Sequence, residues 1–111
     1  MPSQQDIDRF SLAFHREAVE RLRVNPSCIE AALAVLKRWQ VQRGEQSSDV
    51  YLTRWEQLFN GSGGKLAQVV CSDTPEAATL RSMSPLGFLL SAQERQALRR
   101  ETIASAFTEV L

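Results

Sequence analysis

The sequence contains little of what catalytic and metal sites are usually built from. Its 111 residues include one histidine and two cysteines. Cys28 and Cys71 lie too far apart to form a metal-binding C-x-x-C pair, and we expect both to be small buried side chains. His15 stands near charged residues, so we expect it to be solvated on the surface. The sequence therefore predicts no metal, no cofactor and no enzymatic activity.

Net charge and long apolar runs are also missing. Thirteen basic and thirteen acidic residues cancel, which argues against a general nucleic-acid or anionic-membrane surface because such surfaces need clustered cations. No apolar run approaches the length of a membrane span, and the first ten residues do not resemble a signal peptide. We therefore expect a cytoplasmic protein with reduced thiols and no membrane partner.

The glycine-rich stretch GSGGK at 61–65 lacks the features of a phosphate-binding loop. Such a loop needs the pattern G-x-x-x-x-G-K-[ST] between a strand and a helix, so that backbone N–H groups surround the phosphates. Here the glycine spacing differs, leucine follows the lysine, and no strand precedes. We expect a flexible loop at about 60–64 instead.

Helical periodicity is what the sequence does contain. Apolar residues recur at three- and four-residue steps in the stretches 6–25, 27–43, 47–59, 73–83 and 92 to the end. The short stretch 65–73 could also be a strand, but no second strand is available to pair with it, so we expect a helix. The sequence predicts one all-α domain over residues 1–111, a compact bundle of five or six short helices without a sheet.

Two of these helices carry more specific expectations. The helix at 27–43 is apolar over much of its circumference, which is typical of a helix at the centre of a bundle. The last helix has an expected buried side made of Leu98, Ile103, Ala106, Phe107 and Val110.

The segment SPLGFLLSAQERQALRRE at 84–101 is the most organised part of the chain. Pro85 and Gly87 interrupt helical geometry, and Ser91 with Glu94 matches a capping box, in which each side chain binds a backbone N–H of the other residue. The segment therefore turns the chain and restarts a helix. Whether its apolar residues are buried or displayed stays open at this point.

Three motifs give the chain a resemblance to a known group. They are LKRW at 36–39, YLTRWEQLF at 51–59 and LRSMSPLGFLLSAQER at 80–95. Together they resemble a family of small uncharacterised bacterial proteins, similar to antitoxin-like accessory proteins encoded beside a toxin partner in small operons. The chain departs from this pattern at 87–89 and at 61–64. The resemblance implies a non-enzymatic module that binds a protein partner encoded nearby.

A protein that covers a partner needs exposed anchors more than catalytic groups. Trp39 and Trp55 would by default pack in the core, but aromatic and arginine side chains dominate many protein interfaces. On this interpretation a partner docks on an apolar groove rimmed by arginines. The candidate anchors are Trp39, Tyr51, Trp55, Phe88, Arg95 and Arg99.

Two other functions stay open. A DNA-binding regulator could use a helix-turn-helix within 74–100 that presents Arg95, Arg99 and Arg100. An enzyme would need His15 in a cleft with a shifted pKa. Association of two copies into a twofold dimer is compatible with each of these functions.

Overall fold

A computed structural model describes residues 4–43, 49–61 and 63–110, with side chains at 4–42, 50–61 and 65–102. These residues form α-helices and one short 3-10 helix, and the described part of the chain contains no strand. The elements are α1 (Gln4–Val24), α2 (Cys28–Arg43), α3 (Asp49–Asn60), α4 (Gly63–Val70), α5 (Pro75–Ser82), η1 (Gly87–Leu89) and α6 (Ala92–Val110). The predicted all-α class is confirmed.

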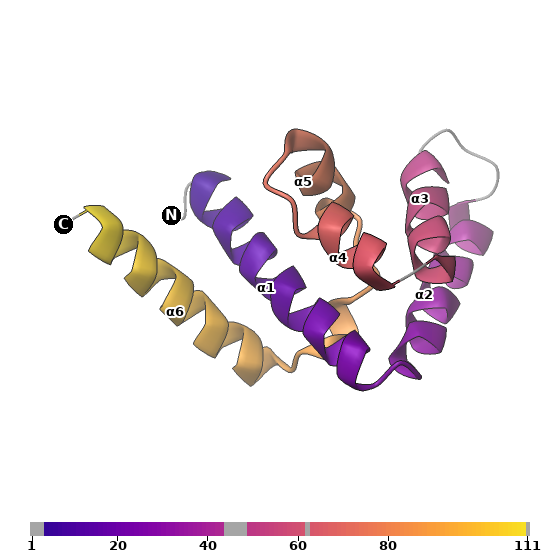
Figure 1. Cartoon of the computed structure of the whole chain (residues 1–111), viewed down its shortest axis with the longest axis horizontal. Helices are drawn as coiled ribbons and strands as arrows, with labels where there is room; N and C mark the ends of the chain where they lie inside the picture. The colour runs from indigo at the N-terminus through magenta and orange to yellow at the C-terminus, as the bar shows by residue number, and fades with distance from the viewer. Residues whose placement is uncertain (1–3, 44–48, 62, 111) are drawn as a thin grey trace.

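Helix α1 lies at the centre of the arrangement (Figure 1). It packs on α6 on one side and on α4 and α5 on the other, while α2 and α3 form a hairpin at the far end of the molecule. The expectation that the helix at 27–43 is central is wrong. Helix α2 packs mainly on α3 and leaves Val41 76% exposed. Its apolar residues include the exposed Ala31 and Ala34.

The core is formed by the first five helices and the segment that follows them. Trp55 is fully buried, stacks on Phe59 with ring centroids 5.6 Å apart, and donates its indole N–H to the Leu80 carbonyl at 2.9 Å. This contact ties α3 to α5. The other buried apolar residues are Phe14, Ala18, Leu22, Ala32, Leu36, Leu52, Leu58, Phe59, Leu66, Val70, Ala77, Leu80, Leu86 and Leu90.

Local capping interactions fix two of the helix starts, and the one at Ser91 is the capping box that the sequence predicts. The Thr74 hydroxyl accepts a hydrogen bond from the Ala77 N–H at 3.1 Å, and Pro75 occupies the first turn of α5. The Ser91 N–H donates to Glu94 Oε1 at 2.9 Å, and the Glu94 N–H donates to the Ser91 hydroxyl at 3.1 Å. Both arrangements satisfy N–H groups that a helix start leaves without partners.

The break expected at 60–64 is shorter in the structure. Helix α3 continues to Asn60 and α4 already begins at Gly63, with residue 62 outside the described part. In the last helix, Leu98 is half-buried against the core. The side chains expected to continue its buried side, at 103, 106, 107 and 110, lie outside the described residues.

None of the described helices combines the length and the apolar character that crossing a membrane requires.

Candidate functional site

The segment between α5 and α6 is anchored at both ends and displays one aromatic ring. Pro85, Leu86 and Leu90 are buried, whereas Phe88 is 46% exposed. The Leu89 N–H donates to the Leu86 carbonyl at 3.1 Å, which closes the short turn of η1. The apolar residues of this segment are therefore neither all buried nor all displayed. Pro85, Leu86 and Leu90 are buried, and Phe88 is exposed.

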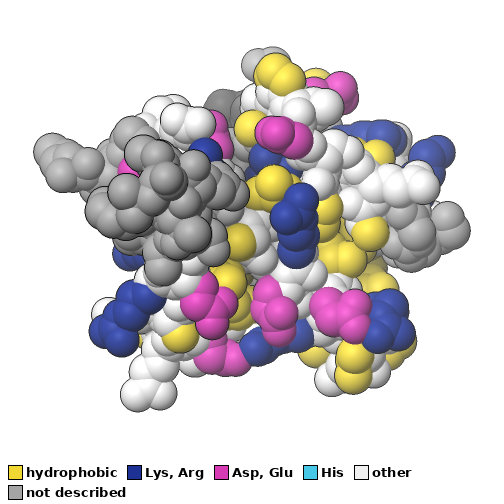
Figure 2. All heavy atoms as spheres, turned by 60° about the vertical axis from the view of Figure 1, so that its left-hand side comes forward, with side chains coloured by type: hydrophobic (Ala, Val, Ile, Leu, Met, Phe, Trp, Pro, Cys, Tyr) yellow, Lys and Arg dark blue, Asp and Glu magenta, His cyan; other side chains and the backbone are white. Residues whose placement is uncertain are grey.

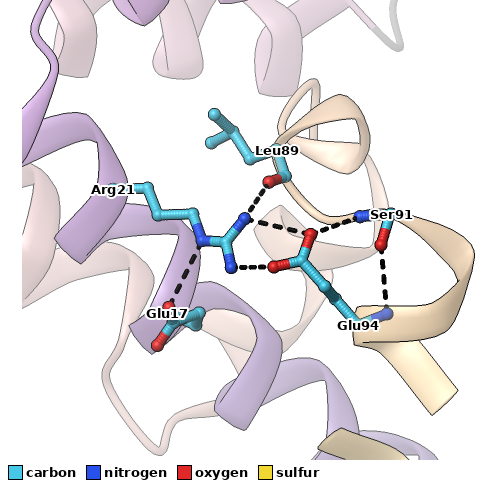
Figure 3. A network of polar contacts seen from close by, with 5 residues as sticks. All are labelled: Glu17, Arg21, Leu89, Ser91 and Glu94. Atoms are coloured by element: carbon cyan, nitrogen blue, oxygen red, sulfur yellow. Dashed lines mark hydrogen bonds and ion pairs between the residues drawn. The ribbon is translucent and has the colours of Figure 1, made fainter. Parts of the chain in front are cut away.

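Arg21 of α1 fastens this segment and the start of α6 to the core (Figure 3). Its Nη1 donates to the Leu89 carbonyl at 2.6 Å and to Glu94 Oε1 at 3.2 Å, and its Nη2 pairs with Glu94 Oε2. Its Nε donates to Glu17 Oε1 at 3.3 Å. The paired guanidinium, with help from the Ser91 N–H, lowers the pKa of Glu94 to about 2. Sequence reasoning missed Arg21, because its partner is 73 residues away.

Arg95 and Arg99 lie against the aromatic rings of α1. The guanidinium carbon of Arg95 is 5.5 Å from the centroid of Phe14, and that of Arg99 is 4.8 Å from the centroid of Phe10. Cations above ring faces gain cation–π attraction. Arg95 also donates to the Gly87 carbonyl, and a Cβ at Gly87 would come within 3.2 Å of its Nη2. The glycine therefore allows the arginine to approach the backbone closely.

A pocket of about 430 Å³ opens beside this network. Its apolar lining comes from Val24 at the end of α1, Cys28 at the start of α2 and Leu89, and Glu17 and Glu20 lie at its edge. Figure 2 brings the α6 side of the molecule forward. It shows hydrophobic side chains across the middle of this face, with acidic and basic side chains together along the lower edge.

The predicted anchors are divided between two places. Phe88, Arg95 and Arg99 come together around η1 and the start of α6. Trp39 and Tyr51 are half-buried against the core on α2 and α3, in the hairpin that lies on the other side of α1 from α6. The prediction that Trp55 is an exposed anchor is wrong, because the residue is 0% exposed and its indole N–H already donates to the Leu80 carbonyl.

His15 is not the solvated residue that the sequence predicts. Its side chain is 3% exposed, and its ring centroid lies 5.3 Å from that of Phe14 and 6.2 Å from that of Trp55. Nδ1 lies 2.7 Å from the Ser11 carbonyl, and Nε2 is buried without a partner. Burial, with a smaller contribution from the charge of Arg81, lowers the pKa of His15 to about 4. The ring is thus neutral near pH 7.

The sequence did hold a signal for this burial. Positions 15, 18 and 22 are spaced by three and four residues, and Ala18 and Leu22 are both buried on the same face of α1. His15 extends that stripe toward the start of the helix. The charged residues beside it in the chain point to other faces, because neighbours in a helix are turned about 100° from one another.

Arg81 of α5 is a second buried polar residue that sequence reasoning missed. It is 5% exposed, and its Nη1 donates to the carbonyls of Val70 and Ser72 at 2.8 Å each. These carbonyls lie at and just beyond the end of α4, where a cation is favoured by the helix dipole. Arg81 also lines a groove of about 820 Å³ between α1 and α5. We interpret its role as holding α4 and α5 together.

The described residues contain no group of three His, Cys, Asp or Glu side chains that could hold a metal ion. Cys28 and Cys71 are half-buried free thiols, and burial raises the pKa of Cys71. Helix α6 packs on α1, and α5 packs on α1 and α4. Arg95 and Arg99 therefore contact α1, whereas a recognition helix would present such arginines to DNA.

Comparison with known proteins identifies no relative, since no family model, no curated protein and no solved structure matches this chain.

Proposed function

We propose that the protein is a non-enzymatic accessory module, antitoxin-like in its mode of action, that binds a partner protein through the surface formed by η1 and the start of α6. We call this the η1–α6 surface and define it by Phe88, Leu89, Arg95 and Arg99. The observation that carries the proposal is the display of Phe88, 46% exposed, on a segment anchored by the buried Leu86 and Leu90. A ring held in place in this way can bind with little loss of conformational freedom.

The charges around Phe88 indicate what kind of partner fits. Arg99 and Arg100 are exposed on α6, and Arg95 is half-buried between them and η1. Aromatic and arginine side chains dominate the binding energy of many interfaces, and complementary charge increases the rate of association. We therefore propose a partner that presents an apolar side chain flanked by Asp or Glu.

The cellular setting follows from the same proposal. A module that covers a partner encoded in the same operon acts in the cytoplasm. The free thiols of Cys28 and Cys71 fit a reducing compartment.

The test is co-purification with matched surface variants. The tagged full chain is recovered from its own cells at moderate salt, and any stoichiometric protein is identified by mass spectrometry. The affinity of the purified pair is then measured by calorimetry for wild type, Phe88→Ala and Val41→Ala. Val41 is the control because it is 76% exposed near the end of α2 and lies outside the η1–α6 surface.

We expect Phe88→Ala to weaken binding by roughly 30-fold, the effect of losing an interface hot spot worth about 2 kcal/mol. Val41→Ala should bind like wild type, and both variants should keep the wild-type melting temperature within about 2 °C. Equal binding by wild type and Phe88→Ala would overturn the surface assignment. Nucleic acid that co-purifies and is released as salt is raised would instead favour the DNA-binding regulator.

A further inference from the structure

Among the described side chains, every buried apolar residue precedes α6, and Leu98 of α6 is half-buried against this core. The buried apolar residues run from Phe14 in α1 to Leu90, and none of the described α6 side chains at 92–102 is buried. Helix α6 packs closely on α1, and its remaining contacts with other elements are few. Figure 1 shows it lying along one side of the molecule, with its second half beside the start of α1.

Three charged side chains at the start of α6 contact α1. Arg21 pairs with Glu94, Arg95 lies over Phe14, and Arg99 lies over Phe10. The side chains of Arg21 and Glu94 remain 35% and 42% exposed. Contacts of this kind are individually weak and are screened by salt.

The contacts of α6 also occupy groups that the η1–α6 surface needs. In this structure the guanidinium groups of Arg95 and Arg99 lie on the rings of Phe14 and Phe10, whose centroids are 6.2 Å apart. Movement of α6 away from α1 would free both arginines and uncover the two rings together.

A change of direction is built into the chain just before α6. Leu90 is anchored in the core at 4% exposure and has an extended backbone, with φ −119° and ψ 136°. Ser91, the next residue, is exposed and caps α6. The capping box lies within α6 and Ser91, so it can survive a rotation about the Leu90–Ser91 link.

We infer that α6 is a releasable arm. It opens from α1 as a unit about Ser91 while α1 to α5 and Leu90 stay folded, and its opening regulates the η1–α6 surface by freeing Arg95 and Arg99. The regulatory part rests on the proposed function, whereas the opening itself does not. Regions that open below the global unfolding energy exchange their amide hydrogens faster than the core.

Hydrogen exchange of the isolated full chain tests the opening. We expect the amides of α6 to exchange at least about tenfold faster than those of α1 and α3. Glu94→Gln should accelerate α6 a further three- to fivefold, about the effect of losing a partly exposed ion pair, and leave α1 and α3 unchanged. Glutamine can still close the capping box, so this variant removes charge without removing the cap.

Glu17→Gln is the matched control. Glu17 binds the same guanidinium group, at 3.3 Å from Arg21 Nε, but belongs to α1. Loss of the Glu17 charge should leave the amide hydrogens of α6 exchanging at the wild-type rate. Raising NaCl from 0.05 to 0.5 M should accelerate exchange in α6 relative to α1, after correction with an unstructured peptide.

Two results would overturn the inference. One is exchange of α6 at the same rate as α1 and α3, which would mean that the protein opens only as a whole. The other is a uniform acceleration of all helices by Glu94→Gln. No partner is present in the measurement, so its outcome is independent of whether the η1–α6 surface binds one.

Discussion

Acidification from pH 7 to pH 4 should destabilise the protein through the buried ring of His15. The ring is 3% exposed, and its Nε2 has no partner that could stabilise a proton. The groups that face it from the other packed helices are the Trp55 ring and the cationic Arg81. In the folded chain the pKa is therefore lowered from 6.5 to about 4.

The sign and size of the effect follow from proton linkage. Below pH 6.5 the unfolded chain binds a proton at His15, whereas the folded chain does not until about pH 4, so the free energy of unfolding falls across this window. At roughly 1.4 kcal/mol for each tenfold change in proton affinity, the loss is about 2 kcal/mol at pH 5 and about 3 kcal/mol below pH 4. Above pH 7 both states are neutral at this residue, and it contributes no pH dependence.

Urea unfolding followed by tryptophan fluorescence measures the effect, because Trp55 is fully buried. The free energy of unfolding is determined between pH 7.5 and 4 for wild type and for His15→Gln. Since the chain has one histidine, the difference between the two curves isolates this residue, and carboxylate titrations cancel. We expect the wild-type curve to fall relative to the variant by about 2 kcal/mol at pH 5.

Parallel curves for wild type and His15→Gln would refute this reasoning. If the variant does not fold, the ring of the wild-type protein can be followed by NMR. The His15 Cε1–H resonance should keep its neutral position down to about pH 5. A midpoint near 6.5 would mean that the ring is solvated.

Three further predictions concern Trp55, Arg81 and Glu94. Trp55→Phe loses the indole hydrogen bond and leaves a small cavity, so we expect a loss of about 2 to 3 kcal/mol in urea unfolding. Arg81→Met leaves two carbonyls at the end of α4 without a donor and should cost about 3 kcal/mol, whereas the exposed Arg38→Met should change stability by less than about 0.5 kcal/mol. The Glu94 carboxylate should titrate by NMR with a midpoint of about 2, and Arg21→Gln should move this midpoint upward toward 4.5. A midpoint that does not move would mean that the ion pair is absent in solution.

Features set by nearby residues could be predicted from the sequence. Ser91 with Glu94 starts α6, as the sequence indicates, and Thr74 with Pro75 starts α5 in the same local way. These arrangements link residues no more than four positions apart, so they depend little on how the helices pack. The helix predicted for 65–73 is confirmed over 65–70, within α4 (Gly63–Val70), and is wrong over 71–73, where the helix has ended.

The candidate site was predicted only in part, and the failures share a cause. Phe88 is displayed as an anchor should be, but Trp55 lies in the core and His15 is buried. The apolar face of a helix can contain residues that are buried in the core and residues that are exposed for a partner, and their spacing in the sequence is the same. Which of them is covered depends on the helix that packs against it.

The sequence by itself determined the all-α class, the approximate helix boundaries and the caps, because backbone hydrogen bonds and side-chain periodicity act over a few residues. Only the tertiary structure decided that α1 and not α2 is central, and that Arg21 joins Glu94 across 73 residues. Burial and long-range pairing depend on helix packing, and several packings of short helices bury similar apolar area. The choice among them is made by specific contacts such as those of Trp55 and Arg81, which exist only once the chain has folded.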